Sequence, residues 1–470
     1  MLTSIQAQLS DQLQSLQKAQ AADPMPTAAD RIDRLKRLET GLLNYEDMLV
    51  EAMSEDFSYR APGESRNFDV TGTVAAIRTA RRHVKKWMKR RRVGTPLYLM
   101  PARAHIQPQP KGVVGVVSPW NFPIFLSLIP IAEAFGAGNR VMLKPSELTP
   151  RTSQVLTEML TKNFRPDELI VVGGDAGVGA AFVSLPFDHI IYTGSTAVGR
   201  KVAEAAAKNL VPTTLELGGK CPVVIGEHGD MKRAVERLVY SKYLNAGQIC
   251  IAPDYALVPE SRKEELIAAV VAKIDEFYGD YNACPAYSAI INDRHVGRIE
   301  SLIKAAEDSG AKVIQAKTSS ASNARKIPPT VIVDPALDTP VMSEEIFGPV
   351  LPILTYKNRE DAQRIIAHNP NPLALYVFTQ KREERDYWLK NSKSGGACVN
   401  ETLFHVITDT LPFGGVGGSG QGTYHGRAGF DEFSHLKSVF VQPKLNGMFL
   451  FNPPHGPFKH LVGRIFRKLV

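Results

Sequence analysis

Cysteine is scarce in this sequence, and the features of exported or membrane-spanning chains are missing from it. Only four cysteines occur in 470 residues; none forms a C-x-x-C pair or has a histidine at zinc-ligand spacing. We therefore expect neither a disulfide framework nor a metal site. The N-terminus lacks the basic flank and apolar stretch of a secretory signal, and no apolar run is long enough to span a membrane. These absences predict a cytoplasmic protein in which a reactive thiol stays reduced.

Acidic residues are fewer than basic ones, and the formal net charge is +8. Much of the positive charge lies in one block, from Arg78 to Arg92. Such a block is able to attract nucleic acid, an anionic membrane or an acidic partner. No nucleic-acid recognition module accompanies it, so we interpret it as a solvated helix face near a subunit contact and expect no nucleic-acid partner.

Short β-branched runs alternate with helical stretches from Lys111 onward, and the pattern starts again after Glu216. Such alternation is typical of parallel sheets covered by helices on both faces. The fold class is therefore α/β, with a Rossmann-like nucleotide-binding domain made of residues 1–96 and 111–215 and a second α/β domain made of residues 216–412. The predicted strands of the first domain are Val113–Val117, Arg140–Leu143, Leu169–Val172 and His189–Tyr192.

Two segments outside this alternation have patterns of their own. Leucines at helical spacing, after a capping pair of Thr27 and Asp30, predict one amphipathic helix from Thr27 to about Phe57. Short extended pieces interrupted by prolines, from Leu97 to Gln109, predict a ribbon that projects between domains. We assign residues 97–110 and 431–445 to this bridging ribbon and residues 446–470 to a C-terminal tail.

Two motifs have the pattern of a dinucleotide site. In Thr193-Gly-Ser-Thr-Ala-Val-Gly199 a strand turns at Gly194 into a helix that begins near Ser195, and the amides of a helix N-terminus suit a pyrophosphate. Its spacing is G-x-x-x-x-G rather than G-x-G-x-x-G, so alone it equally fits a structural turn. Lys144-Pro-Ser-Glu147 places an acid at the carboxyl end of a strand, which favours ribose hydroxyls over an extra phosphate and indicates NAD. Alone, this motif equally fits a surface turn.

Three residues have side chains suited to chemistry at a carbonyl group. Cys250, in Asn245-Ala-Gly-Gln-Ile-Cys250, carries a thiol that is strongly nucleophilic once ionised. Glu216 opens Glu-Leu-Gly-Gly-Lys220, where a carboxylate is able to act as a general base. Asn121, in a stiff loop between two prolines, offers an amide donor for an oxyanion. A buried small hydrophobe, a turn glutamate and a turn asparagine are the alternatives if each is taken alone.

Seven motifs in order resemble the successive signatures of the aldehyde dehydrogenase superfamily over nearly the whole chain. They are Pro-Trp-Asn-Phe-Pro123, Lys144-Pro-Ser-Glu, Thr193-Gly-Ser-Thr-Ala-Val-Gly, Glu216-Leu-Gly-Gly-Lys, Gly-Gln-Ile-Cys250, Glu344-Glu-Ile-Phe-Gly-Pro and Pro412-Phe-Gly-Gly. The stretch Thr423–His435 looks like the class-3 branch. Three further stretches look like the bacterial coniferyl aldehyde dehydrogenase group: Ala80–Met88, Leu185–His189 and Ala252–Tyr255.

This resemblance implies an NAD(P)-dependent enzyme that oxidises an aldehyde to the carboxylic acid through a thioester hydrolysed by water. It makes Cys250 the nucleophile, Glu216 the general base and Asn121 the oxyanion donor, in a catalytic domain of residues 216–412. It also implies a homodimer or tetramer, joined through a ribbon like Leu97 to Gln109 and a strand like Ser438 to Gln442. The implied cofactor residues are Lys144, Glu147, Thr193, Gly194, Ser195, Thr196, Ala197, Val198, Gly199, Glu345 and Phe347.

Two departures from the family pattern limit this transfer. Cys221 follows Lys220 where many relatives have a small hydroxyl residue, so a second thiol is expected near the site. Class-3 relatives with the same Lys-Pro-Ser-Glu accept NADP, so Glu147 indicates a preference for NAD without excluding NADP. An acylating enzyme that transfers its thioester to coenzyme A, and a non-catalytic binding protein on the same fold, remain as alternatives.

The substrate and the C-terminal tail stay open at this stage. Coniferyl aldehyde and medium- or long-chain aliphatic aldehydes are both candidates, and Trp120, Tyr243 and Phe404 are candidates to line an aromatic or apolar pocket. A helix is predicted after Pro457, with one apolar stripe opposite basic residues. We expect it to dock over the substrate entrance or on the other subunit. Peripheral membrane contact is the less favoured alternative, because the segment is too short to span.

Overall fold

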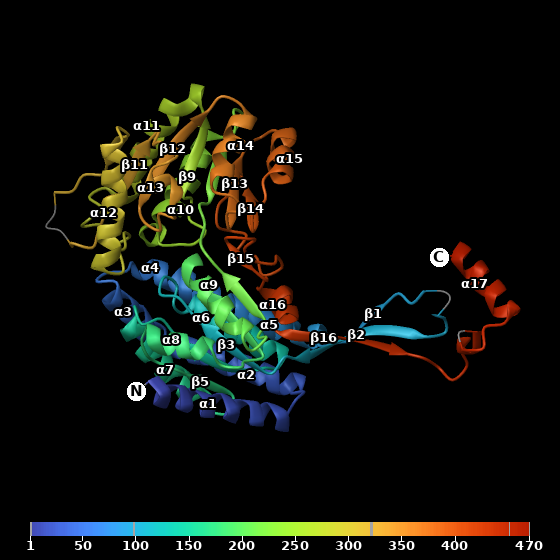
Figure 1. The fold of residues 1–470 in the computed structure, drawn as a ribbon. Helices are drawn as coiled ribbons and strands as arrows, with labels where there is room; N and C mark the ends of the chain where they lie inside the picture. The colour runs from blue at the N-terminus through green and yellow to red at the C-terminus, as the bar shows by residue number, and fades with distance from the viewer. Residues whose placement is uncertain (1, 97–98, 320–322, 451, 470) are drawn as a thin grey trace.

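Two large lobes and a long thin arm make up the molecule in this computed structural model (Figure 1). The structure describes residues 2–96, 99–319, 323–450 and 452–469. Each lobe contains one parallel or mostly parallel sheet, and the arm contains a third, three-stranded sheet. The α/β class and the parallel sheets predicted from the sequence are therefore confirmed.

The first lobe is built on a six-stranded sheet of order β15-β7-β6-β3-β4-β5. Neighbouring strands run parallel, except that β15 runs antiparallel to β7. Nearly every side chain of β3, β4 and β6 is buried, as expected for strands covered on both faces. The strands are β3 (Val113–Val117), β4 (Arg140–Lys144), β5 (Leu169–Val171), β6 (His189–Thr193), β7 (Thr213–Glu216) and β15 (Gly420–Gln421).

Helices cover both faces of this sheet. Leu9, Leu13 and Leu16 of the N-terminal helix pack against the sheet residues Val113 and Met142. The helices of this lobe are α1 (Leu2–Ala22), α2 (Ala28–Asn44), α3 (Glu46–Asp56), α4 (Pro62–Glu64), the π-helix η1 (Ser65–Thr71), α5 (Gly72–Trp87), α6 (Phe125–Ala137), α7 (Pro150–Asn163), α8 (Ala176–Val183), α9 (Thr196–Ala207) and α16 (Gly426–Glu432).

The single helix predicted from Thr27 to about Phe57 is wrong in one respect. Thr27 and Asp30 form the expected capping box at its start. The helix breaks at Tyr45, whose backbone leaves helical geometry between α2 and α3. Leucine spacing persists through the break because both helices bury their leucines in one core. The sequence pattern of two such helices is the same as that of one continuous helix.

The second lobe is built on a seven-stranded sheet of order β10-β11-β12-β9-β8-β13-β14. All neighbours are parallel except β10, which runs antiparallel to β11 at one edge. The strands are β8 (Pro222–Ile225), β9 (Tyr255–Pro259), β10 (Lys312–Gln315), β11 (Thr330–Val333), β12 (Val350–Tyr356), β13 (Ala374–Phe378) and β14 (Gly396–Val399). The helices are α10 (Met231–Tyr243), η3 (Leu244–Gly247), η4 (Glu260–Arg262), α11 (Lys263–Tyr278), α12 (Asp293–Asp308), α13 (Pro340–Ser343), α14 (Arg359–His368) and α15 (Arg382–Asn391).

The strand β15 belongs to the first lobe although it lies late in the chain, beyond residue 412. The chain therefore passes from the first lobe to the second after β7 and returns before β15. The division into residues 1–96 with 111–215 and residues 216–412 stays a prediction.

The arm is a three-stranded antiparallel sheet of order β1-β2-β16. Its strands are β1 (Arg91–Val93), β2 (Arg103–Pro110) and β16 (Ser434–Val441), and η5 (Met448–Leu450) and α17 (Pro457–Leu469) follow. Residues 97 and 98 of the predicted ribbon lie outside the described residues. The predicted strand Ser438–Gln442 begins four residues earlier than expected, because β16 pairs with β2 from Ser434 onward. Figure 1 places α17 at the far end of the arm, away from both lobes.

Candidate active site

Cys250 lies in a short loop between η3 and β9, at the junction of the two lobes. Asn245, just before it, has a left-handed backbone with φ of 49°, which is unusual for a residue other than glycine. The side chain of Gln248 fixes this loop: its amide donates to the carbonyls of Asn245 at 2.9 Å and Ala289 at 3.0 Å, and its oxygen accepts from the backbone N–H of Ile291 at 3.0 Å. Three hydrogen bonds thus hold the thiol-bearing loop in one conformation.

The expected second thiol lies directly behind this loop. Cys221 is fully buried, and its Sγ is 3.5 Å from the carbonyl oxygen of Cys250. The backbone N–H of Ala374 donates to the same sulfur at 3.3 Å. Burial raises the pKa of the Cys221 thiol well above its usual range, so this sulfur is protonated and donates to the carbonyl. Cys221 supports the loop from the core side.

Asn121 reaches the Cys250 loop from the first lobe. Its side chain is buried, and its Nδ2 donates to the carbonyl of Gln248 at 3.1 Å. The side chain of Asn245 donates back to the carbonyl of Asn121 at 3.2 Å. A side-chain amide has two N–H donors, so one fixes the orientation and the second is left for another acceptor.

A buried ion pair supports the loop that carries Asn121. Asp69 of η1 accepts the backbone N–H groups of Ile124 and Phe125, each at 3.1 Å, where this loop enters α6. The other carboxylate oxygen of Asp69 is 2.7 Å from the guanidinium of Arg60, and both side chains are fully buried. Because these donors satisfy the carboxylate on both sides, the pair fixes the start of α6.

Glu216 ends β7 and points into the same interior. Its carboxyl is buried, and neither oxygen finds a hydrogen-bond partner among the residues that the structure describes. Burial raises the pKa of Glu216 well above its usual range, and the carboxylates of Glu432 and Glu133 act in the same direction. A buried carboxyl with a raised pKa and no partner among the described residues is suited to proton transfer.

The loop with Glu345 and Phe347 is tied to the Glu-Leu-Gly-Gly-Lys turn. Nζ of Lys220 donates to the backbone carbonyls of Val341 and Glu344, each at 2.9 Å, and also contacts the carboxylate of Asp254. The second oxygen of Asp254 accepts the backbone N–H of Ile346 at 3.0 Å. This buried pair therefore sets the position of the loop relative to β7.

Glu345 itself lies against the double-glycine turn. Burial raises its pKa to about 8, the charge of Asp254 adds to the rise, and the backbone N–H of Gly219 opposes it. A Cβ at Gly218 would lie 2.6 Å from Cδ of Glu345, so only glycine leaves room for this carboxyl. For Cys250, burial raises the pKa of the thiol to about 12, and the charges of Glu345 and Glu216 act in the same direction.

Two cavities meet at the thiol. One, of about 570 Å³, is lined by Thr193–Ala197, Glu216–Gly218, Glu345 and Phe347. The other, of about 310 Å³, is lined almost entirely by apolar side chains. Of the residues that the structure describes, Asn121 and Cys250 line both cavities. Two small molecules, one in each cavity, would therefore lie next to each other at the Cys250 sulfur.

The larger cavity has the features of a dinucleotide site. Ser195 caps α9, and the helix N-terminus opens into the cavity as predicted. A Cβ at Gly194 would lie 2.6 Å from Cζ of Tyr192, and one at Gly199 would collide with Leu217, so both glycines are required for close packing. Val198 is exposed on the first turn of α9.

Lys144 and Glu147 lie beyond the lining of this cavity. The Lys144 ammonium is buried, 2.9 Å from the carbonyl of Pro145 and 3.3 Å from the half-exposed carboxylate of Glu147. The strand β4 pairs with β3, and β3 pairs with β6, which ends at Thr193. Lys144 ends β4 and Glu147 follows it, at the carboxyl edge of the sheet. That is the edge at which dinucleotides bind in doubly wound sheets.

Sequence reasoning missed two residues of the larger cavity, His295 and Arg298 of α12. Arg298 donates to the backbone carbonyls of Glu345 at 3.2 Å and Ile346 at 2.6 Å. Burial lowers the pKa of His295 to about 4, so its ring is neutral, and it lies 5.3 Å from the ring of Trp120. Their spacing of three places both on one helix face, but nothing local indicates which loop that face meets.

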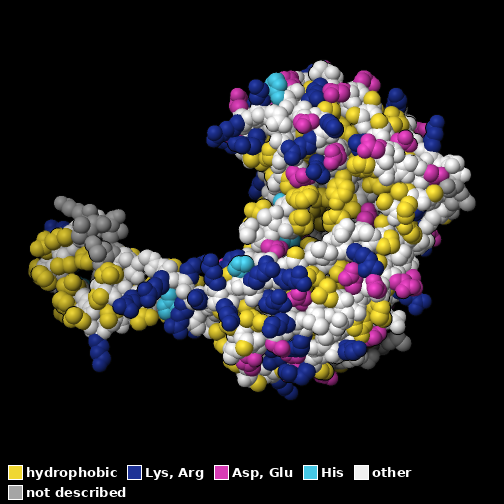
Figure 2. Space-filling model, turned by 180° about the vertical axis from the view of Figure 1, so that it is seen from behind, with side chains coloured by type: hydrophobic (Ala, Val, Ile, Leu, Met, Phe, Trp, Pro, Cys, Tyr) yellow, Lys and Arg dark blue, Asp and Glu magenta, His cyan; other side chains and the backbone are white. Residues whose placement is uncertain are grey.

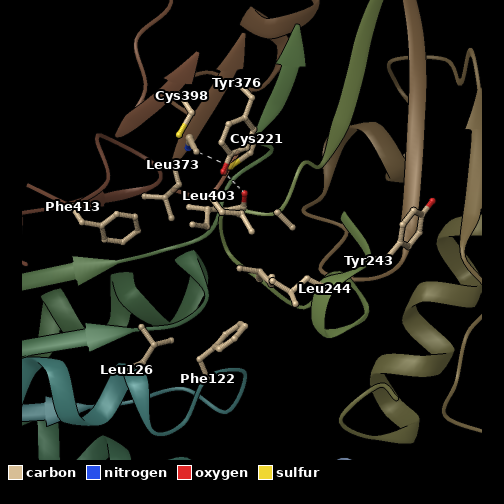
Figure 3. Packing of buried hydrophobic residues seen from close by; sticks show 14 of the residues in the cluster. Phe122, Leu126, Cys221, Tyr243, Leu244, Leu373, Tyr376, Cys398, Leu403 and Phe413 are labelled. Atoms are coloured by element: carbon tan, nitrogen blue, oxygen red, sulfur yellow. Dashed lines mark hydrogen bonds between the residues drawn. The ribbon is translucent and has the colours of Figure 1, made fainter. Parts of the chain in front are cut away.

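The lining of the smaller cavity differs from the predicted aromatic lining in two of three residues. Phe404 lines it, as predicted, but Trp120 lines the larger cavity, where its ring is edge-on to Phe347 at 5.4 Å. Tyr243 lines neither cavity, because it points away into the core of the second lobe. Figure 3 shows Phe122 and Leu126 of the first lobe facing Leu403 and Phe413 across an open space.

Comparison with known proteins by sequence and by structure finds aldehyde dehydrogenases in each case. The model of the family described as the aldehyde dehydrogenase family matches residues 3–439. A coniferyl aldehyde dehydrogenase of Pseudomonas sp. (strain HR199) is 43% identical over 459 residues, covering 96% of this chain and 95% of the relative. A solved substrate-bound state of Staphylococcus aureus AldH has a TM-score of 0.91 at 36% identity, covering 97% of this chain and 99% of that one. An aldehyde dehydrogenase of Mycobacterium tuberculosis complexed with NAD+ has a TM-score of 0.82 at 29% identity, covering 93% and 90%.

Proposed function

Because the chain belongs to the aldehyde dehydrogenase family, we propose that Cys250, Glu216 and Asn121 are the residues with which it carries out NAD(P)-dependent oxidation of an aldehyde to the acid. The observation that carries this proposal is the meeting of the two cavities at Cys250 and Asn121. A carbonyl carbon in the apolar cavity and a hydride acceptor in the larger one would then face each other across the sulfur.

The first half of the proposed cycle forms a thioester on Cys250. The thiol releases its proton to solvent water, and the thiolate adds to the aldehyde carbon, so that the carbonyl oxygen becomes an oxyanion. The free N–H of Asn121 Nδ2 and the backbone N–H of Cys250 stabilise this oxyanion. An oxidised nicotinamide held in the larger cavity would supply the hydride acceptor. Loss of hydride from the carbon and collapse of the oxyanion leave the acyl group on Cys250.

The second half of the cycle hydrolyses this thioester. Glu216 accepts a proton from water, the resulting hydroxide attacks the acyl carbon, and the Cys250 thiolate leaves as the acid forms. The two unpartnered oxygens of Glu216 support this role, because they leave the carboxyl free to bind a water molecule. Its raised pKa makes it a strong base once it is ionised.

The larger cavity fits the adenosine diphosphate end of a dinucleotide by its backbone. We propose that Thr193, Gly194, Ser195, Thr196, Ala197, Val198 and Gly199 hold the pyrophosphate, that Lys144 and Glu147 hold the adenosine ribose, and that Glu345 and Phe347 position the nicotinamide riboside. The carboxylate of Glu147 at the ribose favours NAD over NADP, because it repels a second phosphate there.

The apolar cavity supports a substrate with an aromatic ring or an extended apolar chain. Its described lining includes Phe122, Phe125, Leu403, Phe404 and Phe413, with few polar groups apart from Asn121 and the thiol. We propose coniferyl aldehyde or a related aromatic aldehyde as one substrate class and medium- or long-chain aliphatic aldehydes as the other. Comparing kcat/KM over cinnamyl, benzyl and aliphatic aldehydes with both cofactors separates them.

We further propose a cytoplasmic homodimer joined through the arm. The outer edge of β16 in the three-stranded sheet is open among the described strands, so its backbone groups are available to a second chain. All four cysteines are free thiols, which suits a reducing compartment. Light scattering after size exclusion measures the mass, with a tetramer as the other possible result.

The decisive experiment on the catalytic residues substitutes the nucleophile. Cys250→Ala and Cys250→Ser should abolish NADH formation while NAD+ still binds, as measured by calorimetry. Cys284→Ala is the matched control, because this half-buried thiol lies outside both cavities. Near-normal turnover of either Cys250 variant refutes the proposal. Turnover that requires coenzyme A would indicate the acylating alternative, which no comparison favours.

A further inference from the structure

Arg298 of α12 lines the larger cavity without an acidic partner. Among the residues that the structure describes, no carboxylate forms an ion pair with its guanidinium, which instead contacts two backbone carbonyls. The acids whose charges act on it are Glu345, Glu344 and Asp254. A cation on a cavity wall points to an anionic ligand only if these three acids leave its charge unneutralised.

Each of the three acids is prevented from neutralising Arg298. Asp254 is buried and already contacts Nζ of Lys220. The pKa of Glu345 is about 8, so its carboxyl is mostly neutral near pH 7. Glu344 is exposed to water, which weakens the effect of its charge. The positive charge of Arg298 therefore remains available to a ligand in the cavity.

The guanidinium of Arg298 also has unused hydrogen-bond donors. An arginine side chain carries five N–H groups in one plane. Nη1 donates to the carbonyl of Glu345 at 3.2 Å, and Nη2 donates to that of Ile346 at 2.6 Å. The other N–H groups have no acceptor among the described residues. A planar set of free donors on a charged group matches the oxygens of a phosphate.

The start of α9, on the first lobe, lines the same cavity and is itself suited to a phosphate. Residues 195–197 belong to the lining, and the amides of a helix N-terminus attract an anion. The helices α9 and α12 lie on the two sides of the junction between the lobes (Figure 1). A pyrophosphate bound at α9 therefore shares its cavity with a cation from the other lobe.

The surroundings of Arg298 make an unpaired cation costly. Figure 2 shows apolar side chains gathered in the hollow between the two lobes on one face of the molecule. In the larger cavity the ring of Trp120 lies edge-on to Phe347, and the neutral ring of His295 is 5.3 Å from Trp120. A charge in such a setting is unfavourable unless an anion pairs with it. A bound phosphate would remove this cost.

We propose that Arg298 binds the pyrophosphate of the dinucleotide from the second lobe, at the phosphate next to the nicotinamide riboside. Because the same guanidinium holds the carbonyls of Glu345 and Ile346, the bound phosphate also fixes the loop beside the nicotinamide. Arg298 supplies the cation for the pyrophosphate, since Lys144 is hydrogen-bonded to Pro145 and paired with Glu147. This inference rests on the proposed function, in which the larger cavity takes the cofactor.

The test measures the affinity of the full-length protein for ADP-ribose, which contains the pyrophosphate but no nicotinamide, by calorimetry. Arg298→Gln should weaken this binding about thirtyfold, because charge-assisted hydrogen bonds to a phosphate are lost. AMP contains only the adenosine-side phosphate, so its affinity should fall by less than about threefold. Arg298→Lys keeps the charge and should stay within about fivefold of the parent, with binding of ADP-ribose that still weakens as salt rises.

The matched control is Arg294→Gln, which removes the same charge from an exposed position one turn earlier on α12, outside the cavity lining. It should bind ADP-ribose as the parent does. Parent-like affinity of Arg298→Gln overturns the inference. A loss in Arg298→Lys as large as the thirtyfold expected for Arg298→Gln also overturns it and assigns the guanidinium to loop support alone; this outcome decides even if Arg298→Gln fails to fold. Failure of the parent itself to bind ADP-ribose would instead refute the proposed cofactor site as a whole.

Discussion

The protonation state of Cys250 offers a quantitative test of the electrostatics in the site. With a pKa of about 12, about three thiols in a hundred thousand are ionised near pH 7.5, against about one in ten for a thiol of ordinary pKa about 8.5. The ionised fraction is therefore about three-thousandfold lower. A more basic thiolate is a better nucleophile, and a Brønsted slope of about 0.5 recovers roughly fiftyfold of this loss. We expect iodoacetamide to alkylate Cys250 of the cofactor-free protein about fifty times more slowly than an exposed peptide thiol.

Glu345 makes the same test specific to one charge. Its carboxyl has a pKa of about 8, so it is neutral well below that pH and negative above it, where its charge raises the pKa of Cys250. Glu345→Gln should therefore speed alkylation about tenfold at about pH 9.5 and leave it unchanged at about pH 6. Glu344→Gln is the matched control, because this neighbour is not among the charges that act on the thiol.

Mass spectrometry of the Cys250 peptide over a pH series measures these rates. A Cys250 rate equal to that of the exposed peptide near pH 7.5 would refute the burial argument. An effect of Glu345→Gln of the same size at both pH values would refute the charge argument, since a neutral carboxyl exerts no such field.

Three further outcomes follow from the site and its support. Gly218→Ala should displace the Glu345 carboxyl, which the new Cβ would approach to 2.6 Å from Cδ, and lower kcat/KM roughly a hundredfold in steady-state assays. Arg60→Met leaves Asp69 buried and unpaired, so the free energy of unfolding measured in urea should fall by about 3 kcal/mol or more. Glu147→Gln removes a half-exposed charge, and the ratio of kcat/KM with NADP to that with NAD should rise about fivefold.

Controls for these variants come from open or exposed positions. Gly63→Ala places its Cβ in space where no atom lies within 4 Å, so activity should not change. Arg66→Ala removes exposed pairs with Glu46 and Asp47 and should alter unfolding by less than about 1 kcal/mol. A loss in either control as large as in its partner would mean that the matched variant acts through general instability.

The local sequence pattern was sufficient to predict much of the secondary structure of the first lobe. The strand Val113–Val117 was predicted to the residue, because a valine-rich run that starts after Gly112 and ends before Ser118-Pro119 has clear ends. The helix start at Ser195 and the capping box at Thr27 were also predictable from the sequence, since each depends on residues within one helical turn. The break at Tyr45 was not predictable from the sequence, because apolar spacing continues across it.

Long-range contacts account for what the sequence did not reveal. The position of Cys221 behind the Cys250 carbonyl depends on β8 packing beside the loop, across 29 residues of chain. Arg298 reaches the Glu345 loop across 47 residues, and no motif connects them. The assignment of Trp120 and Tyr243 to the apolar pocket failed for the same reason: proximity to a motif in sequence does not determine which side of the loop a ring occupies.

The apolar lining of the smaller cavity also bears on how the reaction ends. A neutral aldehyde enters such a cavity at little cost, but the carboxylate that replaces it is an anion, and few groups of the described lining are placed to solvate it. The apolar cavity that binds the neutral aldehyde therefore binds the carboxylate product only weakly. High concentrations of the acid should therefore inhibit the enzyme only weakly.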